Sequence, residues 1–270
     1  MKIAISNIAW DMSEQDAIKR LMLERNVRGV EIAPTKVWND PRTVSVEEMR
    51  SYRRYWEDSG IDIIALQSLL FGHPEMTIFD GAEQREKTKE YLRRMIDIAA
   101  ELGAKVLVFG SPKNRSAGYR NNEDGWRIAV EFFRNLGEYA HNKGVFFCIE
   151  PNPRKYDCTF VCDTDEALKL VQAVNDPGFR LHLDAAILTL NGEAIDRSIA
   201  SGKNYLCHFH ISQPQLLPVG RGDVDHQTFA RVLKELDYDR WTSVEMRASD
   251  GTANTDTVRN TLDYVVSVYG

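Results

Sequence analysis

The sequence contains VFFCIE at residues 145–150, TDEALKLVQAV at 164–174 and RLHLD at 180–184. The first and last segments are too short, and too rich in apolar, β-branched or aromatic residues, to be helices. The middle segment has the spacing of an amphipathic helix. Asp163 precedes it, and Glu166 follows three residues later, which is the spacing of a capping box. A strand, a helix and a strand in this order predict a parallel βαβ unit.

The same alternation continues along the whole chain. Helical patterns cover segments such as 83–102, 124–142 and 226–236, and Gly60, Gly103 and Gly144 each follow a helical run as a C′ glycine does. Eight strands are expected, at residues 2–6, 29–32, 61–67, 105–110, 145–150, 180–184, 205–211 and 241–246.

Eight βα units without a break in composition favour one closed barrel over an open doubly wound sheet. In place of a GxGxxG motif, Ser6-Asn7-Ile8-Ala9 follows the first strand, which counts against a dinucleotide-binding fold. We therefore expect an α/β protein, a single (β/α)₈ TIM-barrel domain that spans residues 1–270.

Composition restricts the function classes. The chain is 43% hydrophobic and 27% charged, with 34 basic and 40 acidic residues and a net charge of −6. This charge argues against a general nucleic-acid or anionic-membrane binder. The four cysteines lack a CxxC spacing and are expected to be reduced thiols. No secretion signal and no apolar run near the roughly 18 residues of a spanning helix are evident, so we expect a cytoplasmic protein.

Potential metal ligands stand at the C-terminal ends of four consecutive expected strands, the end at which such barrels place their active sites. They are Glu150, Asp184, His210 and Glu245. Each carboxylate alone would also fit a helix cap or a solvated loop. Four such groups crowded together need a counter-ion. Three carboxylates and one imidazole suit one divalent ion, Mn²⁺ or Mg²⁺ first, with Co²⁺ or Zn²⁺ as alternatives.

Five motifs carry a family resemblance: CIEPNP (148–153), RLHLDAA (180–186), CHFHIS (207–212), GRGDVD (220–225) and SVEMR (243–247). With them the chain resembles, over essentially its whole length, the xylose isomerase-like TIM barrels. The specific likeness is to sugar phosphate isomerases and epimerases, which are related to ketose 3-epimerases and to AP endonuclease-type barrels. The resemblance implies that Glu150, Asp184, His210 and Glu245 bind one divalent metal ion, and that Glu150 and Glu245 also act as the acid/base pair.

The chemistry agrees with that implication. A metal that binds the carbonyl and hydroxyl oxygens of a hydroxyketone stabilises the enediolate formed when the α-proton leaves. Two carboxylates on opposite sides of that carbon can remove a proton from one face and return it to the other, which is epimerisation. If one base moves the proton to the neighbouring carbon, the result is aldose–ketose isomerisation.

The chain departs from the free-ketose epimerases in its substrate-contacting residues. Ile187 stands where they have a histidine, and Leu216 where they have an arginine. Specificity must then come from other residues at the barrel mouth. Lys113, Arg115 and Arg221 favour an anionic sugar derivative. The full set of candidate substrate contacts is Glu31, Gln67, His73, Lys113, Arg115, Asn152, His182, His208 and Arg221.

Several alternatives stay open at this point. The same enolate chemistry would serve a lyase or dehydratase that acts on a keto sugar or cyclitol. An AP-endonuclease-like hydrolase is disfavoured by missing ligands and by the net charge. A sugar-binding barrel without activity is disfavoured by the complete ligand set. The expected partner is a small carbohydrate, within carbohydrate metabolism. The sugar, its phosphorylation, the reacting carbon and the oligomeric state, a monomer, a homodimer or a higher homo-oligomer, are left undetermined.

Overall fold

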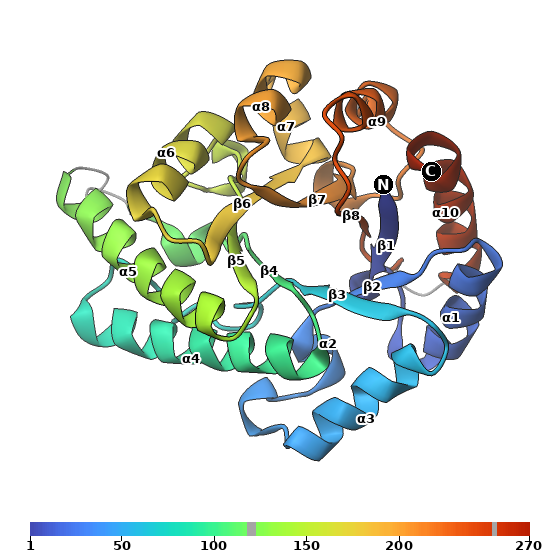
Figure 1. Cartoon of the computed structure of the whole chain (residues 1–270), viewed down its shortest axis with the longest axis horizontal. Coiled ribbons are helices and arrows are strands. Elements are labelled where there is room, and N and C mark those ends of the chain that lie inside the picture. Colours follow the sequence, from blue (N-terminus) through green and yellow to red (C-terminus); the bar gives the residue numbers. More distant parts are fainter. Residues whose placement is uncertain (118–122, 250–252) are drawn as a thin grey trace.

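The structure, a computed structural model, describes residues 1–117, 123–249 and 253–270. Its strands form one closed barrel in chain order, with each strand parallel to the next, and helices surround it (Figure 1). This confirms the expected fold. The strands are β1 (Lys2–Ser6), β2 (Gly29–Ile32), β3 (Asp62–Leu66), β4 (Val106–Phe109), β5 (Phe146–Ile149), β6 (Phe179–Asp184), β7 (Leu206–Ser212) and β8 (Trp241–Glu245).

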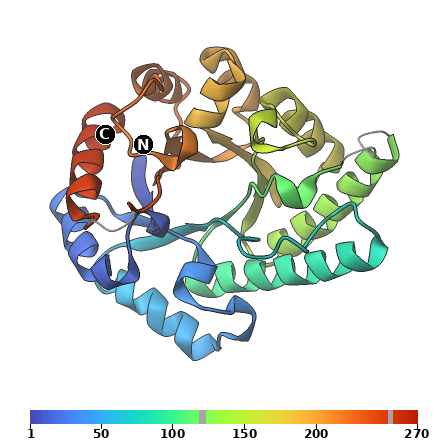
Figure 2. The same cartoon turned by 180° about the vertical axis from the view of Figure 1, so that it is seen from behind.

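The helices follow the strands around the outside, as the views along the barrel from its two ends show (Figures 1 and 2). They are α1 (Gln15–Glu24), α2 (Pro34–Val37), α3 (Val46–Glu57), α4 (Ala82–Leu102), α5 (Glu123–Asn142), α6 (Thr164–Val174), α7 (Ala185–Asn191), α8 (Ile195–Gly202), α9 (His226–Glu235) and α10 (Thr255–Tyr269). Gly60, Gly103 and Gly144 have φ values of 71°, 82° and 70°. These left-handed conformations confirm the predicted helix ends.

Aromatic packing fixes the strands that carry half of the expected ligands. The ring of Phe133 on α5 lies 5.0 Å from that of Phe179 on β6 and 5.6 Å from that of Phe109 on β4. Phe147 on β5 contacts the same cluster, and all four side chains are buried. The carboxyl ends of β5 and β6 are therefore held against a rigid core.

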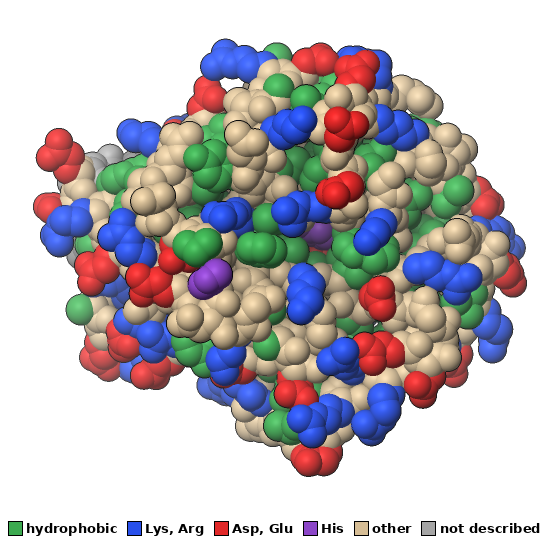
Figure 3. Space-filling model, in the orientation of Figure 1, with side chains coloured by type: hydrophobic (Ala, Val, Ile, Leu, Met, Phe, Trp, Pro, Cys, Tyr) green, Lys and Arg blue, Asp and Glu red, His purple; other side chains and the backbone are tan. Residues whose placement is uncertain are grey.

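The charged surface and the cysteines are as the composition predicts. Basic and acidic side chains are interspersed over the face shown in Figure 3, with several lysines and arginines around its middle. That face is mixed in charge, unlike the uniformly basic surface that a phosphate backbone requires. All four cysteines are free and buried. Within the described residues, no helix combines the length and the apolar character needed to cross a membrane.

The start of α6 differs slightly from a reciprocal capping box. The Asp163 carboxylate accepts the backbone N–H of Glu166 at 2.8 Å, as predicted. The Glu166 carboxylate accepts from the N–H of Cys162 at 2.7 Å, one residue before the cap. Two backbone donors are still satisfied, so the cap fixes the chain where it leaves the β5 loop and enters α6.

We expect Asp163→Ala to lower the free energy of unfolding by about 1 kcal/mol, because one helix donor loses its acceptor. Urea denaturation measures the change. Asp163→Ser keeps a capping oxygen and should retain most of the stability. Equal losses in both variants would contradict a capping role.

Candidate active site

The closed barrel brings the four expected ligands to one end of its interior. Asp184 and Glu245 are the last residues of β6 and β8, Glu150 directly follows β5, and His210 lies on β7. The register pairs Asp184 with His210, and Ser212 with Glu245. Neighbouring strands therefore present their polar side chains at nearly the same level.

The imidazole of His210 lies at the centre of this group. Its Nδ1 is 3.7 Å from Oε1 of Glu150, 3.9 Å from Oδ2 of Asp184 and 3.4 Å from Oε2 of Glu245. One ligand atom from each of Glu150, Asp184 and His210 lies within 4.8 Å of the others. The arrangement can hold one cation between three carboxylates and a nitrogen.

Glu150 is held by its neighbours on both sides. The Asn152 amide donates to its Oε2 at 3.0 Å, and Nε2 of His182 lies 3.2 Å from its Oε1. The carboxylate passes close over Gly110, where an added Cβ would stand 2.3 Å from Oε2. The missing side chain at Gly110 therefore makes the space that Glu150 occupies.

Asp184 has two roles at once. Its Oδ1 accepts the backbone N–H of Ile187 at 2.7 Å, which caps the first turn of α7. Its other oxygen, Oδ2, faces His210 and accepts the hydroxyl of Ser212 at 2.5 Å. A cap and a candidate ligand are thus compatible in one carboxylate, and the cap fixes its rotamer.

Electrostatics show that the residues fit a divalent ion. Burial raises the pKa of Asp184 to about 7, and the charges of Glu150 and Glu245 add to the effect. Burial likewise raises the pKa of Glu150 and of Glu245. Three carboxylates that disfavour one another's ionised forms are stabilised together by a bound cation, which restores their charge at neutral pH.

A fourth carboxylate, Glu31, lies behind His210 in the barrel interior. Oε2 of Glu31 is 3.0 Å from Nε2 of His210, and its Oε1 is 3.4 Å from Nε2 of His208. Burial opposes ionisation of Glu31, but the two imidazoles outweigh it and hold its pKa well below the usual range. An ionised Glu31 accepts the Nε2 proton of His210, which leaves Nδ1 to face the other three carboxylates.

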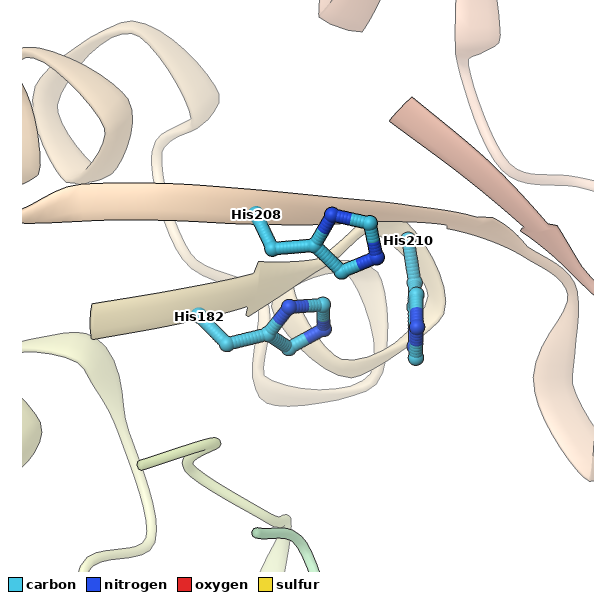
Figure 4. Close-up of side chains that lie close together, drawn as sticks. All are labelled: His182, His208 and His210. Atoms are coloured by element: carbon cyan, nitrogen blue, oxygen red, sulfur yellow. The ribbon is translucent and has the colours of Figure 1, made fainter. Parts of the chain in front are cut away.

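The three interior imidazoles pack against one another. Figure 4 shows His182, from β6, and His208, from β7, pointing toward the ring of His210. The ring centroids of His182 and His210 are 4.1 Å apart, in an edge-on arrangement. Burial, and then the neighbouring imidazoles, lower the pKa of His182 well below its usual value, so this ring packs as a neutral group.

The layer beneath the ligands corrects part of the expected substrate set. Glu31, His182 and His208 are fully buried and do not line the open hollow above the ligands. Strand position alone does not tell how deep a residue lies in the barrel. In this structure the three side chains lie beneath the candidate ligands, where Glu31 and His182 contact His210 and Glu150.

The hollow above the ligands, here the active-site hollow, has a volume of about 520 Å³, in the usual range for small-molecule sites. Gln67 and Asn152, both expected contacts, line it. Gln67 is 1% exposed, and neither atom of its amide has a hydrogen-bond partner within the described part of the chain. A polar ligand would supply that partner. Ile187 and Leu216 also line the hollow.

The expected cations do not gather around this hollow. Arg115 is fully buried, and its guanidinium donates to the backbone oxygens of Phe109 at 3.2 Å and Val161 at 3.3 Å. The Lys113 side chain is 79% exposed and stands 3.9 Å from Asp157. Arg221 is exposed and is not among the lining residues.

The expectation that three cations read an anionic substrate is therefore not supported by the geometry. His73 also lies away from the ligands, with its Nδ1 3.1 Å from Oε1 of Glu75.

The sequence reasoning missed several polar lining residues, among them Ser68, Tyr156, Gln213 and Arg247. Arg247 had a signal, because it follows Glu245 by two residues and alternation then turns both to the same side. Among the described residues, no other arginine lines the active-site hollow. The others lie in loops, where spacing does not predict direction.

Comparisons with known proteins agree with the fold. Residues 20–267 match the profile of the family described as xylose isomerase-like TIM barrel. An L-ribulose 3-epimerase from Methylomonas sp. (strain DH-1) is 27% identical over 154 residues, or 56% of this chain and 53% of that protein. An inosose dehydratase from Clostridium beijerinckii is 24% identical in an alignment that is 293 positions long with its gaps and covers 94% of this chain and 92% of that protein. The match thus spans about half the length of the epimerase and most of the dehydratase.

A solved structure extends the likeness of fold to the whole chain. A D-psicose 3-epimerase, crystallised in the presence of D-fructose, aligns with a TM-score of 0.83 over 100% of both chains. The sequence identity is 18%, so this likeness concerns the architecture.

We expect Glu31→Gln to weaken Mn²⁺ binding by roughly 10- to 100-fold, the usual cost of losing the partner of a metal-bound histidine. Titration calorimetry of the metal-free protein with Mn²⁺ measures the affinity. Glu47→Gln, at an exposed position on α3, is the matched control. Unchanged Mn²⁺ affinity in a folded Glu31→Gln protein would refute the positioning role.

Proposed function

The chain belongs to the xylose isomerase-like TIM barrel family, and from this membership and its site we propose that it is a metal-dependent epimerase or isomerase of a keto sugar. The observation that carries the proposal is the set of three carboxylate oxygens within 3.9 Å of Nδ1 of His210. They lie at the base of an open hollow of sugar-binding size. The epimerase relatives support the same chemistry.

Glu150, Asp184, His210 and Glu245 would hold one divalent ion, with Mn²⁺ or Mg²⁺ preferred by the oxygen-rich set. When bound, that ion supplies the positive charge that stabilises negative charge developing on substrate oxygens. Asp184 is committed to Ser212 and to the cap of α7, so it serves as a fixed ligand.

Glu150 and Glu245 are the proposed proton carriers. They come from β5 and β8, which are not neighbours in the barrel, and both line the active-site hollow. A substrate carbon between them would have one carboxylate at each face. One takes the proton next to the carbonyl and the other returns a proton to the opposite face, which inverts the carbon. Asn152 holds Glu150 in place for this transfer.

We expect exhaustive chelation to abolish turnover of ketoses, because the carboxylate cluster loses the charge that organises it. Adding back Mn²⁺ or Mg²⁺ should restore the rate. Epimer formation is followed by chromatography of the product sugars. A metal-free preparation that keeps full activity would refute metal dependence.

We expect Glu150→Gln and Glu245→Gln each to lower turnover by roughly 10²-fold or more, the scale of general acid–base catalysis. In D₂O, the wild-type protein should place deuterium on the carbon next to the carbonyl. Calorimetry with Mn²⁺ separates loss of the base from loss of the ion, and Glu47→Gln is again the control. Turnover without any deuterium exchange would point to hydride transfer, and normal rates in both variants would remove the assignment.

A dehydratase of a keto sugar or cyclitol is the second candidate. The inosose dehydratase relative favours it, because its match covers 94% of this chain. Ile187 and Leu216, two apolar residues that line the active-site hollow, also allow a substrate different from a free ketose. Mass spectrometry of the product decides between them, since dehydration removes one water and epimerisation leaves the mass unchanged.

A further inference from the structure

A second hollow, of about 630 Å³, adjoins the active-site hollow. Ser68, Ser111, Pro112 and Tyr156 line both, so the two form one continuous opening on the barrel mouth. A single sugar ring over the candidate ligands would occupy the active-site hollow alone. The proposed function therefore leaves the second one without a role.

The sides of the second hollow are tied together. The Asn114 side chain donates to the backbone oxygens of His73 at 2.8 Å and Met76 at 2.9 Å, which joins the loop after β3 to the loop after β4. The Tyr156 hydroxyl accepts the N–H of Gln215 at 3.1 Å and stands at the border of the two hollows. The opening thus has a defined shape in which a ligand group can lodge.

The chemistry of the second hollow suits a polyhydroxylated ring. Phe71 lines it and is 73% exposed, the highest exposed fraction among the large hydrophobic side chains described. Also lining it, Lys113 and Asp157 supply donors and acceptors, 3.9 Å apart. A pyranose has an apolar face for an aromatic ring and hydroxyls that pair with both kinds of group. Two lysines, Lys113 and Lys155, and one carboxylate, Asp157, line the hollow, so its lining is mixed in charge and does not select a phosphate.

We propose that the substrate has two parts: a keto sugar over the carboxylate cluster, and an uncharged second sugar ring that packs on Phe71 in the second hollow. The proposal rests on the proposed function and narrows it to glycosides of keto sugars. The ring on Phe71 contributes binding and takes no part in proton transfer. Its loss should therefore change KM and leave kcat unchanged.

The test compares fructose with two glucosyl-fructoses, maltulose and isomaltulose, on the Mn²⁺-loaded full chain. We expect wild-type kcat/KM to be at least tenfold higher for one disaccharide than for fructose. Phe71→Ala should remove this preference through KM, while fructose turnover stays within twofold. Phe71→Tyr keeps an aromatic face and should keep the preference. Leu217→Ala, another exposed apolar residue outside the second hollow, is the control.

Fructose preferred over both disaccharides, or equal losses for all three sugars in Phe71→Ala, would overturn the proposal. So would a changed oligomeric state of Phe71→Ala in sedimentation with an unchanged substrate preference, because Phe71 would then be a subunit contact. Calorimetric binding of the same sugars is measured in parallel. If none of the three sugars is turned over, the proposed epimerase function is wrong for these substrates. Tighter binding of a disaccharide than of fructose, lost in Phe71→Ala, would still support a sugar site in the second hollow. Binding without that difference would overturn the inference.

Discussion

Three carboxylates crowded around one imidazole, two of them buried and Glu245 half-buried, are the constraint on which this site depends. Burial raises the pKa of all three carboxyl groups, and the charge of Glu150 adds to the effect for Asp184 and Glu245. The charge around His210 is balanced from two sides, by Glu31 in the barrel interior and by the cation that the carboxylates would bind. Glu31, in the barrel interior, neutralises the positive side of His210 and orients the ring. The cation that the upper face requires would complete the balance of charge.

Barrel closure makes this balance possible. Parallel strands end on one side, and the helices after them begin there, so a carboxylate at a strand end can also cap a helix. Asp184 does both, with one oxygen on the first turn of α7 and the other toward His210. Small residues complete the geometry, because Gly110 leaves the space that the Glu150 carboxylate fills. Asp184 and Glu150 are therefore positioned by backbone groups and uncharged neighbours, whereas His210 is oriented by the carboxylate of Glu31.

Much of this was predictable from the sequence, and the reason is periodicity. β1 and β2 match the expected ranges, and the other strands differ by one residue at one or both ends, because buried parallel strands are short apolar runs between helical patterns. The four candidate ligands were chosen from strand ends, and the structure brings their side chains together. Depth and loop direction were not predictable. His208 and Glu31 were expected among the substrate contacts but lie buried beneath the candidate ligands, and the loop residue Arg115 points into the protein and donates to backbone oxygens.

The same division separates chemistry from specificity. The groups that would hold a metal and move protons stand on or next to β5 to β8, where strand geometry leaves little freedom. The groups that would read the rest of a substrate lie in the loops after β3, β4, β5 and β7, including Phe71, Tyr156 and Leu216. Loops change length and direction without disturbing the barrel, so related chains can keep one reaction type and bind different sugars. A likeness that is strong in the strands therefore says much about the reaction class and little about the sugar.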